Sequence, residues 1–125
     1  TMDYETLAKP PLSPPDIIFP IVWSILYTLM GISFAQLEIN NLHDNDTKKV
    51  YYEQLIVNLS WPIFFFTFKW RLFSILIILL LLILVIRMIR VFYRKEKLAG
   101  LLQIPYLLWV SFATYLNIFT YFLNN

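Results

Sequence analysis

The sequence contains no cysteine, two glycines and one histidine, and charged residues make up only 14% of its 125 positions. Without cysteine no disulfide can form, and no thiolate can act as a metal ligand or nucleophile. An average soluble domain carries about 25% charged residues. A fold of this size has too little interior to hide a composition that is 59% hydrophobic. We therefore interpret the chain as an integral membrane protein, and the absence of alternating ten-residue segments favours helices over a barrel.

Four apolar segments predict one all-α domain over residues 1–125, a bundle of transmembrane helices. The predicted spans are about 17–36, 51–68, 72–93 and 101–123, close to the roughly 20 residues that a spanning helix needs. The second span is the least apolar, because Glu53, Gln54 and Asn58 interrupt it. Residues 1–16 hold four of the seven prolines, so we expect a stiff extramembrane loop there and not a signal peptide.

Lysine and arginine are distributed unevenly between the two ends of such a bundle. One end has three basic residues and the other has seven, namely Lys48, Lys49, Arg87, Arg90, Arg94, Lys95 and Lys97. Cytoplasmic loops are enriched in basic residues. We therefore expect the 37–50 and 87–100 loops to be cytoplasmic and the C-terminus to lie outside. The composition favours a bacterial plasma membrane.

Aromatic and amide side chains recur at helical spacing in three of the spans. They form one face per helix, and the sets are Phe19, Trp23 and Tyr27; Gln54, Asn58 and Trp61; and Trp109, Ala113, Asn117 and Thr120. A carboxamide without a partner in hydrocarbon costs several kcal/mol, so Asn58 and Asn117 should face the protein interior. Two interpretations stay open: the amides join helices to one another, or they line a ligand cavity walled by Trp23, Trp61 and Trp109.

Small residues form a ridge along the first span, at Ser24, Thr28, Gly31 and Ala35. Such ridges let helices approach closely. Packing within the chain is the expected use, and a homodimer face is the alternative.

The residues offer little for metal or acid–base chemistry. His43 stands in the polar stretch NNLHDNDTKK, where we expect it to be solvated. The predicted spans contain no group of histidine, cysteine and carboxylate residues that would bind a metal, and we expect no cofactor. No nucleophile–base pair is present either.

Four blocks of the sequence together resemble one known family. KPPLSPP, FPIVWSILYTLMG, QLIVNLSWPIFF and PYLLWVSFATYLN are similar to segments of the TspO/MBR proteins, the tryptophan-rich sensory or translocator proteins that include the peripheral-type benzodiazepine receptor. The resemblance extends from Lys9 to Asn124 and implies a five-helix bundle whose cavity binds porphyrins. By position it implies these ligand-binding residues: Phe19, Trp23, Tyr27, Asn58, Trp61, Trp109, Ala113, Leu116 and Asn117.

The resemblance also implies a function, namely a membrane receptor for protoporphyrin IX or similar flat hydrophobic ligands. Implied roles are stress-related tetrapyrrole regulation and light-dependent porphyrin degradation, for which Trp23 and Trp109 are the candidate residues. Catalysis stays open. The alternatives are a transporter of porphyrin or other amphipaths, and a structural or signalling membrane subunit. No nucleic-acid partner is expected.

Three departures from the family pattern affect these expectations. The family's first helix, before the proline loop, is missing here, so a further span of about 25 to 30 residues is expected upstream of Thr1. The C-terminal YLNIFTYFLNN lacks the basic residue of the proposed cholesterol pattern. Ile77 stands where some relatives carry an intramembrane acid.

Overall fold

The computed structural model describes residues 17–67 and 71–124 of the chain. Two of the predicted features lie outside these residues. They are the proline-rich loop, 1–16, and the end of the second predicted span with the Lys69 and Trp70 that follow it. The helices are α2 (Ile18–Ile39), α3 (Asn45–Pro62), a π-helical turn (Ile63–Thr67), α4 (Arg71–Lys95), α5 (Lys97–Leu101) and α6 (Ile104–Asn124). The predicted all-α membrane bundle is confirmed.

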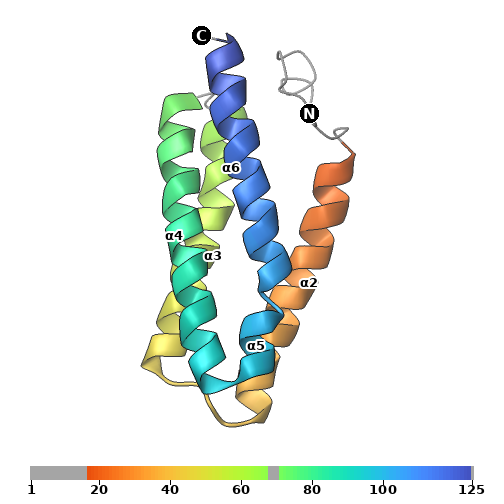
Figure 1. Ribbon diagram of the computed structural model, residues 1–125, viewed down its shortest axis with the longest axis vertical. Helices are drawn as coiled ribbons and strands as arrows, with labels where there is room; N and C mark the ends of the chain where they lie inside the picture. The colour runs from red at the N-terminus through yellow and green to blue at the C-terminus, as the bar shows by residue number, and fades with distance from the viewer. Residues whose placement is uncertain (1–16, 68–70, 125) are drawn as a thin grey trace.

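The long helices run alternately up and down, so that α2 begins at the same end of the bundle at which α6 finishes (Figure 1). The α2–α3 and α4–α5 connections lie together at the opposite end, which we call the loop end. α4 packs against α3, α5 and α6, whereas α2 packs mainly against α5 and touches α6 at few positions. α2 is therefore the long helix least anchored to the others.

Within residues 17–67 and 71–124, three segments are long and apolar enough to cross a membrane: Ile18–Ile39, Leu72–Lys95 and Lys97–Leu123. α3 is not among them, since polar side chains lower its hydropathy. α3 nevertheless lies alongside α4 within the bundle (Figure 1), with Gln54, Asn58 and Trp61 on its buried side. Its crossing of the membrane stays a prediction.

α3 begins six residues before the predicted position, at Asn45 instead of residue 51. Asp44 caps the helix: its carboxylate accepts a hydrogen bond from the Thr47 amide, and the Thr47 hydroxyl oxygen accepts one from the Asp44 amide. This reciprocal pair satisfies donors that the first turn of a helix leaves without partners. The polar run that suggests a loop is therefore the first turn of a helix.

The last predicted span, 101–123, corresponds to α6, which begins three residues later, and a break separates α6 from the short α5, most of which lies in the predicted 87–100 loop. Pro105 cannot donate a hydrogen bond to the carbonyl group four residues earlier, which interrupts the helical ladder. Gly100 brings the α5 backbone against α4, because a Cβ atom at this position would lie 2.7 Å from the Tyr93 Cβ atom. The break therefore combines a missing donor with a close backbone approach.

The small-residue ridge of α2 does not pack against another described helix. Ser24, Thr28, Gly31 and Ala35 are all exposed, and the two hydroxyl groups donate to carbonyl groups of their own helix. The expected packing of this ridge within the chain is not found among the described residues.

Candidate functional site

Aromatic rings from α2 and α6 meet in the half of the bundle away from the loop end. The Trp23 and Trp109 rings are edge to face with centroids 6.3 Å apart, and Phe19 packs against Trp109 at 5.8 Å. Trp23 also stacks on Tyr27 at 5.6 Å. The four aromatic residues that periodicity predicts on these helices therefore form one cluster.

A small hollow lies beside this cluster, between α2, α3 and α6. Its volume is about 20 Å³, and it is lined by Phe19, Trp61, Phe65, Ala113, Leu116, Asn117 and Thr120. A hollow of this size holds about one water molecule. The Trp61 Nε1–H group donates to Asn117 Oδ1 at 2.9 Å, so the indole of α3 and the amide of α6 form one wall.

A second polar group lies on the loop-end side of the aromatic cluster. The Tyr27 hydroxyl donates to Asn58 Oδ1 at 2.6 Å, and Asn58 Nδ2 donates to the Tyr106 hydroxyl at 2.7 Å. The Tyr106 hydroxyl in turn donates to Gln54 Oε1 at 2.7 Å. These four side chains link α2, α3 and α6, and both polar atoms of Asn58 are occupied by tyrosines.

Two buried donors near the hollow have no hydrogen-bond acceptor within residues 17–67 and 71–124. They are Trp109 Nε1 and Asn117 Nδ2. Trp109, Ala113 and Asn117 are four residues apart in turn, so they share one face of α6, with the small Ala113 side chain between the two donors. A polar group without a partner in an apolar environment costs free energy, and an acceptor supplied by a ligand would remove that cost.

The structure therefore gathers the nine residues predicted for the site into two adjoining groups. Phe19, Trp61, Ala113, Leu116 and Asn117 line the hollow. Trp109 contacts Phe19 at the edge of the hollow, and Trp23, Tyr27 and Asn58 follow on from Trp109 in turn through ring contacts and a hydrogen bond.

Sequence reasoning missed Tyr106 and Phe65 as members of these groups. Tyr106 is fully buried and lies three residues before Trp109, so helical spacing alone could have placed it on the same face. Phe65 belongs to the π-helical turn, whose wider spacing shifts side chains away from the α-helical period.

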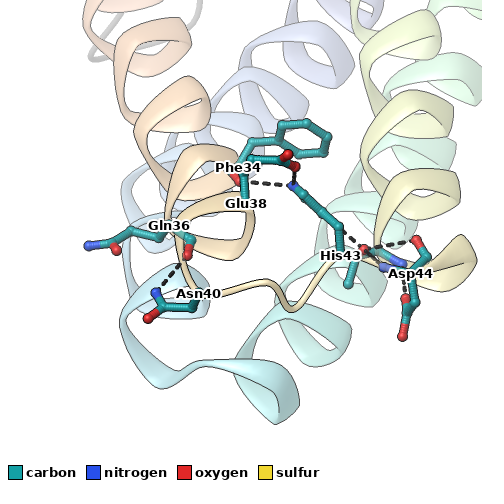
Figure 2. Close-up of polar contacts among 7 residues, drawn as sticks. Phe34, Gln36, Glu38, Asn40, His43 and Asp44 are labelled. Carbon is teal, nitrogen blue, oxygen red and sulfur yellow. Dashed lines mark hydrogen bonds and ion pairs between the residues drawn. The ribbon is translucent and has the colours of Figure 1, made fainter.

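His43 is not the solvated loop residue that its polar neighbours suggest, since its side chain is only 6% exposed. Its Nε2 atom lies 3.0 Å from the Phe34 carbonyl oxygen and 3.6 Å from Glu38 Oε2, and Nδ1 lies 3.1 Å from Thr47 Oγ1 (Figure 2). The imidazole also packs on the Phe34 ring at 4.1 Å. It therefore connects the last turns of α2 to the first turn of α3.

Asp44 joins this region to α4 through an ion pair with Lys95. The hydrogen bond from Lys95 and that from the Thr47 amide lower the pKa of Asp44 to about 2. Within the described ranges, no group of three or more histidine and carboxylate side chains could hold a metal ion. His43 and Asp44 thus have structural partners at the loop end, away from the aromatic cluster.

Fold and site together define an integral membrane helix bundle whose interior is lined by indoles and carboxamides. Residues 1–123 match the model of the TspO/MBR family, and the chain belongs to this family. It is 40% identical to a tryptophan-rich protein TspO of Chlorobaculum tepidum, over 91% of this chain and 74% of that protein. It is 37% identical to a protein of the same name in Archaeoglobus fulgidus, over 97% and 79%. It is also 32% identical to the human translocator protein, over 91% and 70%.

Proposed function

We propose that this protein is a membrane receptor for protoporphyrin IX or a similar flat, hydrophobic ligand, bound between α2, α3 and α6. The observation that carries the proposal is the pair of buried donors, Trp109 Nε1 and Asn117 Nδ2, which lack acceptors among the described residues. A ligand that carries carbonyl, carboxylate or ring-nitrogen acceptors would satisfy both. Membership of the TspO/MBR family, whose resemblance implies a porphyrin-binding cavity, supports the proposal.

The spacing of the two donors favours a large ligand. Trp109 and Asn117 are eight residues apart, about 12 Å along a helix, so a single molecule that meets both must extend along two turns of α6. Between them Ala113 leaves room against the helix surface. The neighbouring rings of Phe19, Trp23 and Trp61 offer faces and edges to a π-system. A macrocycle with polar substituents fits this pattern better than a compact molecule.

Binding of such a ligand requires the hollow to widen, because its volume is about 20 Å³. α2 is the helix that can move with the smallest loss of contacts, since it packs mainly on α5 at the loop end. We therefore propose that α2 tilts away from α6, which separates Phe19 and Trp23 from Trp109. The Tyr27–Asn58 hydrogen bond would mark the boundary between the moving half and the fixed half of α2.

A porphyrin titration of the purified full chain in detergent tests this proposal. The porphyrin Soret band reports binding independently of the number of tryptophans, and tryptophan quenching gives a second readout. Trp109→Phe keeps a flat ring but removes the indole N–H group, and Asn117→Leu removes the amide. Loss of one ligand hydrogen bond should weaken binding by about tenfold.

Phe122→Leu is the matched control, because this α6 side chain is 68% exposed and should not affect the affinity. If both site variants bind protoporphyrin IX as tightly as the unchanged chain does, the intramembrane site is wrong. Transport is a separate outcome: protein-dependent porphyrin flux across liposomes would indicate a transporter, whereas saturable binding without flux would indicate a receptor.

A further inference from the structure

We infer that the outward face of α4 binds an anionic phospholipid from the leaflet at the loop end. Arg90 and Arg94 stand one helical turn apart and are both exposed. Within the described ranges neither forms an ion pair or a hydrogen bond, although other basic side chains nearby do have partners. Two adjacent guanidinium groups are therefore available to an anion.

The neighbouring cations differ in this respect. Arg87 donates to Glu53 Oε1 of α3 at 3.1 Å, and Lys95 is paired with Asp44. Lys97 lies 6.0 Å from the centre of the Tyr93 ring. Lys48 and Lys49 of α3 are also exposed at this end, and no ion pair or hydrogen bond involves their side chains within the described ranges. What sets Arg90 and Arg94 apart is that two guanidinium groups lie one helical turn apart on one face of α4.

An apolar stripe leads along the same face of α4 to the arginines. Leu79, Ile83 and Ile86 are exposed, and their spacing of four and three residues, followed by four to Arg90, keeps them in one line. Leu79 and Arg90 are eleven residues apart, about 16 Å along a helix. That is about half of a hydrocarbon core of roughly 30 Å. The stripe therefore matches one acyl chain of a single leaflet, with the arginines at the level of its headgroup.

The chemistry of this face selects a phosphate-bearing lipid with net negative charge. Guanidinium groups bind phosphate through paired N–H donors, and the exposed Tyr93 ring suits the membrane–water interface. The headgroup of a zwitterionic lipid carries a cation that the two arginines would repel, whereas an anionic headgroup has no such cation. An acidic segment of a protein could meet the arginines but would leave the leucine and isoleucine stripe without its partner.

Native mass spectrometry of the purified full chain can test the site with phosphatidylglycerol and phosphatidylcholine offered in equal amounts. We expect the unchanged chain to retain phosphatidylglycerol preferentially. In Arg90→Gln/Arg94→Gln the preference should fall by about fivefold for each arginine removed. Arg90→Lys/Arg94→Lys keeps the charge but loses the paired donors, so it should retain an intermediate preference.

The matched control is Lys48→Gln/Lys49→Gln, which removes the same charge from exposed positions in the first two turns of α3 at the same end of the bundle. It should leave the lipid preference unchanged. If the glutamine variants of the arginines and of the lysines lose the preference for phosphatidylglycerol equally, only the overall charge matters and the site is wrong. An unchanged preference in Arg90→Gln/Arg94→Gln would also overturn the site. Circular dichroism verifies that the helices persist, and Arg94→Gln alone offers a milder variant.

Discussion

Asn58 joins three helices through one carboxamide, since it accepts from Tyr27 of α2 and donates to Tyr106 of α6. Replacement by leucine removes both hydrogen bonds and leaves the buried Tyr106 hydroxyl without that donor. Hydrogen bonds between membrane helices contribute about 0.6 kcal/mol each on average. We expect Asn58→Leu to lower the free energy of unfolding by about 1–2 kcal/mol, measured by unfolding in mixed detergent micelles.

A double-mutant cycle isolates the Tyr27–Asn58 bond from the other effects of these changes. Tyr27→Phe and Asn58→Ala, alone and together, should show a coupling energy of about 0.6 kcal/mol. Tyr52→Phe is the control, because Tyr52 makes ring contacts that phenylalanine keeps. Additive effects of the two changes would show that the bond makes no contribution.

At this scale the sequence predicts which side chains turn inward but not which of them meet. Helical spacing places Asn58 and Asn117 on buried faces, and both are buried. It leaves open whether each amide bonds to protein or to a ligand, because partners such as Tyr106 and Trp61 come from other helices. His43 shows the same limit, since its burial depends on the last turns of α2, where it meets the Phe34 ring and carbonyl, and not on its polar neighbours.

At the scale of elements, the first turn of α3 depends on the charge of Asp44. The folded pKa of this carboxyl is about 2, below its ordinary value of 3.8. The folded state therefore takes up this proton at lower pH than the unfolded chain does. The ionised Asp44 carboxylate therefore stabilises the folded state fully at pH values above 3.8, and this contribution is lost as the pH falls through about 2. Melting temperatures measured by circular dichroism should decrease over this interval.

Asp44→Asn separates the cap from the charge. Asparagine is also a good N-cap residue, so α3 should still begin at the same position, but the ion pair with Lys95 is removed. The difference in stability between the unchanged chain and this variant should be largest near neutral pH and vanish near pH 2. A difference that stays constant with pH would contradict the ionic contribution.

The contact between α4 and α5 depends on Gly100. An added Cβ atom there would lie 2.7 Å from the Tyr93 Cβ atom and 2.8 Å from its Cα atom, and backbone atoms cannot rotate aside. We expect Gly100→Ala to destabilise the protein by about 1–3 kcal/mol. Thermal unfolding in detergent measures the change.

Gly31→Ala is the matched control, because nothing described lies within 4 Å of a Cβ atom at that position. Alanine is a better helix former than glycine by about 1 kcal/mol, so this variant should be as stable as the unchanged chain or more so. Equal destabilisation by both alanines would show that the close approach to Tyr93 is not the cause.

Helix type and approximate position were predictable from apolar length, whereas the ends were less so. α2 and α4 lie close to their predicted ranges because long apolar segments have few alternatives. The start of α3 was missed because a capping box is made of the same polar residues as a loop. α6 also lies close to its predicted range, whereas α5 was missed because it depends on the close approach of Gly100 to α4 as well as on Pro105.

For the whole molecule, the distribution of charge predicts the membrane orientation. The helices alternate in direction (Figure 1), so the α2–α3 and α4–α5 connections share one end. In and next to these two connections the chain has seven basic residues, namely Lys48, Lys49, Arg87, Arg90, Arg94, Lys95 and Lys97. The positive-inside rule predicts that this end is cytoplasmic. Because the chain has no cysteine, single cysteines can report the orientation without any background labelling.

Lys48→Cys should react with a membrane-impermeant maleimide only after the cells are permeabilised. Ile17→Cys and Leu123→Cys, exposed positions at the other end of the bundle, should react in intact cells. The reverse pattern would place the basic end outside, so that Arg90 and Arg94 would meet the opposite leaflet. Ile17 and Leu123 on different sides would show that the number of crossings is odd and that α3 does not span the membrane.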